Sequence, residues 1–136
     1  MKRAFIFDMD GTMVDNMMVH HRAWQRKLAA LGLDLTLEEV RQSIHGINEE
    51  ILERMFGDRF LPEERRRIAW EKEAEYRDIF LSELRLVPGL EAFLKSALQA
   101  GIRMGIGTAA PHENVQFVLE NLHLRPLFGS VIDASQ

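Results

Sequence analysis

Residues 5–15 read FIFDMDGTMVD, and this stretch indicates the fold more clearly than any other part of the chain. The apolar run over residues 4–7 has no polar alternation, which is typical of a strand covered on both faces in a parallel sheet. Asp8 and Asp10 follow at the carboxyl end of that strand, which is where open parallel sheets bind ligands. Gly11 allows the backbone to turn sharply there.

The spacing of Asp8 and Asp10 predicts chemistry as well as position. Side chains at i and i+2 can point the same way, and two close carboxylates repel unless a cation or a shared proton offsets their charge. Mg²⁺ suits this pair, because it takes a couple of carboxylates together with substrate phosphate and water. One aspartate could attack phosphorus, and the other could protonate the leaving oxygen and then activate water. A strand-end turn with solvated aspartates is the alternative interpretation.

The string FIFDMDGTMVDN, with its further acid at Asp15, resembles the first motif of the haloacid dehalogenase (HAD) superfamily of phosphotransferases. That resemblance implies that Asp8 is the nucleophile and Asp10 the general acid/base. It also implies that Mg²⁺ is held by the Asp8 carboxylate and the Asp10 backbone carbonyl. The dehalogenases that name the superfamily lack the second aspartate, so this chain resembles the phosphoryl-transfer members.

Composition sets broad limits on the function. The 136 residues suffice for one modest domain, and a hydrophobic content of 46% allows a buried core. A net charge of −4 gives no general attraction to nucleic acid or to an anionic membrane. The apolar stretches are too short for a signal peptide or a membrane span, and a chain without cysteine has no disulfide or thiolate chemistry. We therefore expect a cytoplasmic protein that uses neither nucleic acid nor membrane as a partner.

Residues 16–84 are predicted to be almost entirely helical, in four helices. The boundary signals are Gly32 at the end of the first, a capping box over residues 36–39, Asn48 as a cap and Gly57 as the end of the third, and Pro62 at the start of the fourth. The fourth helix contains the run EERRRIAWEKEAEYR, which we interpret as a solvated charged face. Its apolar face is predicted to comprise Ala69, Trp70, Ala74, Phe80 and Leu81.

From about Arg85 the pattern becomes helix, strand, helix, strand. The signals are a helix opened by Pro88-Gly89 and ended by Gly101, a strand over 102–106, a helix containing Val115 and Val118, and a strand at Val131-Ile132. The predicted fold class is α/β with parallel strands. By resemblance it is a HAD-like Rossmannoid sheet, incomplete with strands one to three, with an inserted four-helix cap. The predicted domains are a discontinuous core, 1–15 and 85–136, and a cap, 16–84.

The resemblance covers essentially the whole chain and extends to a second motif and a subgroup. MGIGTAAP, residues 104–111, resembles the second HAD motif, which implies that Thr108 hydrogen-bonds the transferring phosphoryl group, helped by the backbone N–H of Ala109. A hydroxyl and amides at a helix start form a natural anion site. The alternative is an ordinary N-cap threonine. DNMMVHHRAW and IHGINEEIL resemble the cap of the β-phosphoglucomutase-like phosphatases.

In that subgroup the cap carries the specificity loop. The candidate substrate residues that the resemblance places there are His45, Gly46, Asn48 and Glu49. Mutase caps carry an arginine just after this glycine, whereas this chain has Ile47 and Glu49, which favours hydrolysis. A histidine at the place of His20 lies near the cap hinge in the subgroup, with packing or solvent exposure as the alternative. For His45 and Glu49 the alternative is a solvated loop and a helix-start acid that pairs with the helix dipole.

The family pattern continues with a lysine motif and an acidic pair that completes the Mg²⁺ site, and neither occurs up to Gln136. We therefore expect the N-terminal part of a longer enzyme, which alone binds Mg²⁺ weakly and turns over poorly. Because the first strand is central in the family core, we also expect an open sheet edge through which copies could self-associate.

These observations favour a Mg²⁺-dependent phosphohydrolase that acts on a small phosphorylated metabolite, such as a sugar phosphate, through an aspartyl-phosphate on Asp8. The alternatives are a phosphosugar mutase of the β-phosphoglucomutase type, and a catalytically incomplete, self-associating fragment of such an enzyme.

Overall fold

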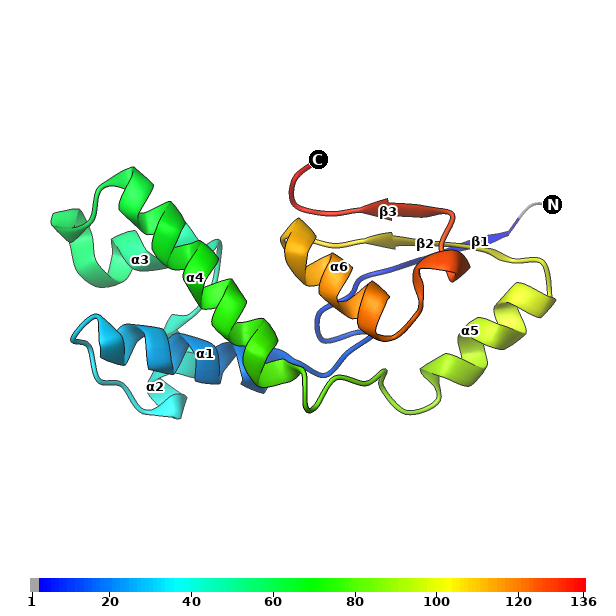
Figure 1. The fold of residues 1–136 in the computed structure, drawn as a ribbon, viewed down its shortest axis with the longest axis horizontal. Coiled ribbons are helices and arrows are strands. Elements are labelled where there is room, and N and C mark those ends of the chain that lie inside the picture. The colour runs from blue at the N-terminus through cyan, green and yellow to red at the C-terminus, as the bar shows by residue number, and fades with distance from the viewer. Residues whose placement is uncertain (1–2) are drawn as a thin grey trace. The chain divides into compact units, whose positions relative to one another are not determined.

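The computed structural model describes residues 3–136, so Met1 and Lys2 of the predicted core lie outside the described residues. Its helices and strands (Figure 1) are β1 Ala4–Phe7, α1 Met17–Ala30, α2 Leu37–Ser43, α3 Asn48–Phe56, α4 Pro62–Phe80, α5 Leu90–Gln99, β2 Arg103–Gly107, α6 His112–Asn121 and β3 Ser130–Ile132. Two short 3₁₀ helices occupy Gly57–Arg59 and Arg125–Leu127. The predicted α/β class is confirmed.

The chain divides into two compact units. The sheet unit comprises Met1–Met17 and Ser82–Gln136, and the helical unit comprises Met18–Leu81. Among the described residues, no helix combines the length and the apolar character that crossing a membrane requires.

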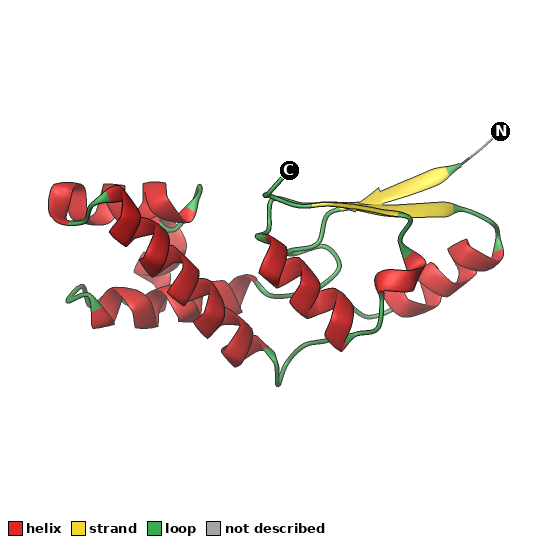
Figure 2. Ribbon diagram, turned by 45° about the horizontal axis from the view of Figure 1, so that its top comes forward, coloured by secondary structure: helices red, strands yellow, loops and turns green. Residues whose placement is uncertain are grey.

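The sheet has the order β1-β2-β3, and both pairings are parallel. Each connection moves one strand further in the same direction, so right-handed crossovers place α5 and α6 on the same face, as Figure 2 shows. The ring of Phe5 lies 5.5 Å from that of Phe93 in α5, and Phe7 lies 6.1 Å from Phe128. Phe7 shares its register with Ile106 and hence with Val131, so these side chains form the helix-covered face.

The opposite face of the sheet corrects one expectation. The uninterrupted apolar run predicted a strand covered on both faces, but Ile6 is 81% exposed and Ile132 is 50% exposed. Both side chains alternate with those of the helix-covered face and point away from α5 and α6. Within residues 3–136, helices therefore cover one face of this sheet.

The helical unit has a core of its own, formed by buried residues from all four helices: Trp24, Leu28, Val40, Ile51, Leu52 and Ile68. The capping box that opens α2 is confirmed: the N–H of Glu39 donates to Thr36 Oγ1 at 3.2 Å, and the N–H of Thr36 donates to the Glu39 carboxylate at 2.8 Å. Gly32 and Gly57 follow α1 and α3 with φ of +93° and +57°, which explains why glycine stops these helices.

Two predictions for the helical unit are wrong. Asn48 does not cap α3, because Ile47 occupies the N-cap and the Asn48 side chain donates instead to Glu73. The charged run of α4 is not simply a solvated face, because Lys72 and Glu73 are buried while Trp70 is 60% exposed. The buried stripe runs at helical spacing through Ile68, Lys72, Tyr76 and Phe80, together with Ala69 and Glu73; Leu81, also predicted to be buried, is 56% exposed.

Candidate functional site

A tight loop after β1 fixes the first two candidate residues. The carbonyl of Met9 accepts the N–H groups of Thr12 and Met13, at 3.2 and 2.9 Å, and Met9, Met13 and Val14 are completely buried. Gly11 has φ of +70°, and its N–H donates to the carbonyl of Val14 at 2.9 Å. A side chain at this backbone conformation would be strained, so the turn that follows Asp10 depends on glycine.

Asp8 and Asp10 each have one oxygen oriented by a neighbour. Asp8 is exposed, and its Oδ1 accepts the N–H of Met9 at 2.7 Å. Asp10 is half-buried, and its Oδ1 accepts the side-chain amide of Asn16 at 2.7 Å. Asn16 is completely buried, and its own Oδ1 accepts the N–H of Gly11 at 3.2 Å. Because Gly11 requires an oxygen there, the amide nitrogen must face Asp10.

Thr108 begins the loop that follows β2. Its N–H donates to the carbonyl of Ile132 at 3.0 Å, and its hydroxyl oxygen accepts the N–H of Ala110 at 3.1 Å. The N-cap of α6 is Pro111, so Thr108 is not the ordinary N-cap that the sequence left open. A hydroxyl that accepts one bond still has its hydrogen to donate. Ala109, next to it, is exposed.

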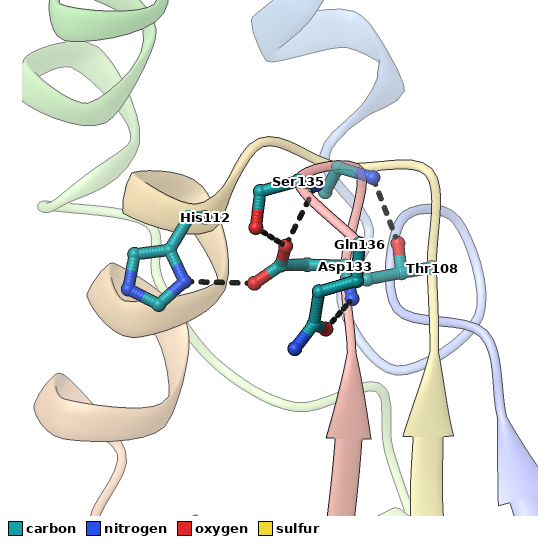
Figure 3. Close-up of polar contacts among 6 residues, drawn as sticks. Thr108, His112, Asp133, Ser135 and Gln136 are labelled. Carbon is teal, nitrogen blue, oxygen red and sulfur yellow. Dashed lines mark hydrogen bonds and ion pairs between the residues drawn. The ribbon is translucent and has the colours of Figure 1, made fainter.

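Asp133, which the sequence analysis did not single out, occupies the corresponding position after β3. It is 6% exposed, and its carboxylate accepts the N–H and the hydroxyl of Ser135 at 2.9 and 2.6 Å. His112 Nδ1 lies 2.8 Å from its other oxygen (Figure 3). The bonds from Ser135, and then that from His112, lower the pKa of Asp133 to about 2. The signal was present in the sequence, since Asp133 directly follows the third predicted strand just as Asp8 follows the first.

Parallel pairing brings these residues to one edge of the sheet. Asp8, Thr108 and Asp133 directly follow β1, β2 and β3, and all three strands run the same way. Polar side chains at the carboxyl ends of parallel strands form the usual ligand site of such sheets. Sequence reasoning found the first two of these three residues.

In the helical unit, buried polar contacts connect His20 to Asn48. Lys72 is 2% exposed, and its Nζ lies 3.0 Å from His20 Nδ1 and 2.9 Å from Glu73 Oε1. Asn48 Nδ2 donates to the same Glu73 oxygen at 2.6 Å. The His20 ring stacks on Tyr76 with centroids 3.9 Å apart. Since a lysine ammonium only donates, Nδ1 of His20 is an acceptor, and its Nε2 is the nitrogen that carries hydrogen.

The remaining cap candidates lie on the loop before α3 and in its first turn. His45 and Gly46 are exposed and Glu49 is half-buried. The carbonyl of His45 accepts the Arg54 guanidinium at 2.9 Å, and Gly46 has φ of +90°. The structure thus brings His20 and Asn48 into one polar cluster. The other three candidates belong to the same unit but are on the loop before α3 (His45 and Gly46) or in its first turn (Glu49).

The oxygen donors at the sheet edge fit Mg²⁺ in kind. Asp8 and Asp10 supply two carboxylates next to solvent, and Mg²⁺ typically uses one or two carboxylates while it keeps several waters. Across residues 3–136, no group of three or more His, Asp or Glu side chains is placed to hold a metal ion. The site therefore fits a hydrated, oxygen-seeking ion better than one that requires a complete protein cage.

Comparisons with known proteins agree with this geometry. The sequence model of the family "haloacid dehalogenase-like hydrolase" matches residues 2–136. Protein CbbY of Cereibacter sphaeroides is 29% identical over 123 residues, which is 85% of this chain and 54% of that protein. The β-phosphoglucomutase of Clostridium difficile is 29% identical and superimposes with a TM-score of 0.80, over 100% of this chain and 63% of that one. A CbbY structure from Rhodobacter sphaeroides in complex with phosphate, 24% identical, has a TM-score of 0.80 over 100% of this chain and 65% of that one.

A parallel sheet with carboxylates at its carboxyl edge and an inserted helical unit defines a Rossmann-type α/β fold. The chain belongs to the haloacid dehalogenase-like hydrolase family. It spans about half the length of the curated relative, and rather less than two thirds of the solved structures described above.

Asn16 provides a first test of this geometry. Asn16→Ala removes a completely buried amide together with its bonds to the Asp10 carboxylate and the Gly11 N–H, which we expect to cost about 1–3 kcal/mol. Urea unfolding, monitored by far-UV circular dichroism, measures the change in the free energy of unfolding. The control is Asn121→Ala, at an exposed position, which should change stability by less than about 0.5 kcal/mol. Equal effects for the two variants would contradict the structural role of Asn16.

The lowered pKa of Asp133 predicts how the stability of the protein depends on pH. Because its pKa is lowered from 3.8 to about 2, the folded protein favours the carboxylate. Its contribution to stability is fully present above its ordinary pKa and is lost as pH falls toward about 2. The stability difference between wild type and Asp133→Asn should therefore be largest near neutral pH and shrink between about pH 4 and pH 2. Urea titrations across this range test it, and a difference that does not vary with pH would refute it.

Proposed function

We propose that this chain carries the nucleophile, the general acid/base and the phosphate-binding loop of a Mg²⁺-dependent phosphohydrolase that acts on a small phosphorylated metabolite, by class a sugar phosphate. The observation that carries the proposal is that Asp8 and Asp10 follow β1 while Thr108 follows the adjacent parallel strand β2. Membership of the hydrolase family supports it. A similar structure, CbbY of Rhodobacter sphaeroides, is in complex with xylulose-(1,5)bisphosphate, which supports the substrate class.

The proposed reaction has two steps. In the first, an Asp8 oxygen attacks phosphorus, the bond from phosphorus to the ester oxygen breaks, and Asp10 gives its proton to the leaving alcohol. In the second, Asp10 removes a proton from water, which attacks the aspartyl-phosphate, releases inorganic phosphate and restores the Asp8 carboxylate. Asp10 thus returns to its protonated form, and the net reaction is hydrolysis of the ester.

The chain's own groups prepare these steps. The bond from the Met9 N–H orients the Asp8 carboxylate, and the amide of Asn16 orients Asp10. The Thr108 hydroxyl would donate to a phosphoryl oxygen, with the N–H of Ala109 beside it. Mg²⁺, held by the Asp8 carboxylate and the Asp10 backbone carbonyl, would offset the negative charge that accumulates between the carboxylate and the phosphate.

The loop before α3 favours hydrolysis over mutase chemistry. A mutase must hold a second phosphate, for which a cation is the natural partner. Ile47, which is 62% exposed, and the acidic Glu49 stand where the resemblance would place an arginine. His20, His45, Gly46 and Asn48 remain the proposed substrate-side residues of the helical unit.

The nucleophile assignment is tested with Asp8→Asn, since an amide cannot form an acyl phosphate. We expect wild-type protein, mixed with small phosphate monoesters and Mg²⁺, to gain one phosphoryl group on Asp8 in acid-quenched mass spectra. Because the lysine and the acidic pair of the family pattern do not occur among these residues, slow turnover is expected, and a single-turnover measurement is therefore the sensitive one. The Asp8→Asn variant should show no labelling and an unchanged unfolding midpoint.

The matched control is Asp34→Asn, an exposed aspartate in the helical unit, which should label as wild type does. Labelling that persists in Asp8→Asn would sink the assignment. If a bisphosphate sugar primes isomerisation of a sugar monophosphate without net phosphate release, the mutase alternative replaces hydrolysis.

The exposed side of β1 favours a second candidate, self-association of this chain. Among residues 3–136, β2 is the strand that pairs with β1, and Ile6 in β1 is 81% exposed. A strand edge with apolar side chains is a template for pairing with another copy. We therefore expect the mass from light scattering to rise with protein concentration.

Ile6→Lys should shift this equilibrium toward monomer, because a lysine on an edge strand opposes pairing. Leu61→Lys, at an exposed position of the helical unit, is the control and should leave the masses unchanged. A monomer at every concentration, or equal behaviour of the two variants, would rule out association through β1.

A further inference from the structure

Three hydrogen bonds tie the segment after β2 to the last residue of β3 and the segment that follows it. They join the Thr108 N–H to the Ile132 carbonyl at 3.0 Å, the Ala134 N–H to the Ala110 carbonyl at 3.1 Å, and His112 Nδ1 to Asp133 Oδ2 at 2.8 Å. The first two are backbone bonds, and the third is a side-chain bond at the first residue of α6 (Figure 3). The loop over residues 108–111 is thus held at both of its ends.

The side-chain bond is made by the residue that directly follows a proline. Pro111 has no N–H, so it cannot donate across to the segment after β3. His112 follows immediately, and its imidazole makes the next tie. The His112 side chain therefore supplies the hydrogen bond that the Pro111 backbone cannot make, at the point where the loop enters α6.

The Asp133 carboxylate is held by other residues besides His112. Ser135 occupies Oδ1 of Asp133 through its N–H and its hydroxyl, and the side chain of Gln136 accepts the N–H of Asp133 at 3.1 Å. Oδ2 is left toward His112, whose side chain is 55% exposed while that of Asp133 is 5% exposed. A nearly buried carboxylate is stable only if its oxygens are hydrogen-bonded, so Nδ1 of His112 is the donor.

We propose that His112 and Asp133 are positioning residues for the phosphate-binding loop: their bond holds residues 108–111 in the conformation that presents Thr108 and Ala109 to a phosphoryl group. This inference rests on the proposed function for the role of Thr108. Neither His112 nor Asp133 touches the phosphoryl group. They act through the backbone bond of Ala110 to Ala134 and through the bond that the Ala110 N–H makes to Thr108 Oγ1.

The test compares His112→Ala with His112→Asn in the 136-residue chain. Asparagine places an amide N–H near the position of Nδ1 and should rescue the bond, whereas alanine cannot. His112 is half-exposed, so its loss should not unfold the protein. The control is His123→Asn, just past the opposite end of α6, where φ of +54° suits asparagine.

Two readouts separate positioning from general stability. Amide hydrogen exchange of Ala134 should accelerate about tenfold in His112→Ala while Val118 in the core of α6 keeps its protection. Inorganic phosphate, titrated while the amide signals of Thr108 and Ala109 are followed by NMR, should bind about tenfold more weakly. Both properties should return to wild-type values in His112→Asn, and Asp133→Asn should weaken phosphate binding as His112→Ala does.

Each other outcome is decisive. Wild-type exchange and phosphate affinity in His112→Ala would overturn the inference, and so would a failure of His112→Asn to rescue, because the donor would then not be what matters. If wild-type protein binds no phosphate near Thr108, the proposed phosphate site fails on its own. The exchange of Ala134 then still decides whether the pair fixes the loop, and unchanged exchange in His112→Ala would refute that.

Discussion

The parallel pairing of β1, β2 and β3 is the constraint on which the candidate site depends. Asp8, Thr108 and Asp133 are more than 20 residues apart in sequence, and they share an edge because each directly follows a strand of the same direction. A shift of pairing by one residue would turn Phe5 and Phe7 away from α5 and break their ring contacts with Phe93. The same packing that places the phenylalanines against the helices therefore determines where the aspartates emerge.

Buried polar groups then refine the position of each functional side chain. Asn16 at 0% exposure holds both Asp10 and the Gly11 turn, and Asp133 joins Ser135 to His112. Polar groups removed from water must be hydrogen-bonded to avoid a large cost. This requirement makes such residues rigid supports, and rigid supports are what a phosphoryl-transfer site needs, since its catalysis depends largely on positioning and charge.

Local signals predicted well wherever one residue type has one physical role. The capping box at Thr36, the glycine stops and the proline that opens α4 are decided by backbone chemistry within a few residues, and the structure has them. Prediction was wrong where distant residues decide the outcome. Lys72 looked like part of a solvated face, but it is buried between His20 and Glu73, which lie 52 positions and one position away. Similarly, the Asn48 side chain does not cap α3 and donates to Glu73 instead.

The sequence motifs indicated residues of reactive type, but they did not indicate the residues that hold those side chains in position. The bond from Asp133 to His112 depends on the spacing of β2 and β3, which no local sequence pattern encodes. For Ile6 the local signal was misleading: its apolar character predicted burial, but among residues 3–136 the helices pack on the other face and leave it 81% exposed. Local chemistry thus suggested the proposed reacting groups, whereas the packing of the sheet showed which residues hold them.

The central claim is that the loops after β1 and β2 form one phosphoryl site around Asp8. The most direct measurement is the amide NMR spectrum of the isotope-labelled protein with Mg²⁺ and beryllium fluoride. Beryllium fluoride mimics a phosphoryl group on a carboxylate. The account predicts that signals of residues 8–12 and 108–110 shift together, and that they do not shift in Asp8→Asn. Shifts confined to one of the two loops, or identical shifts in wild type and Asp8→Asn, would contradict it.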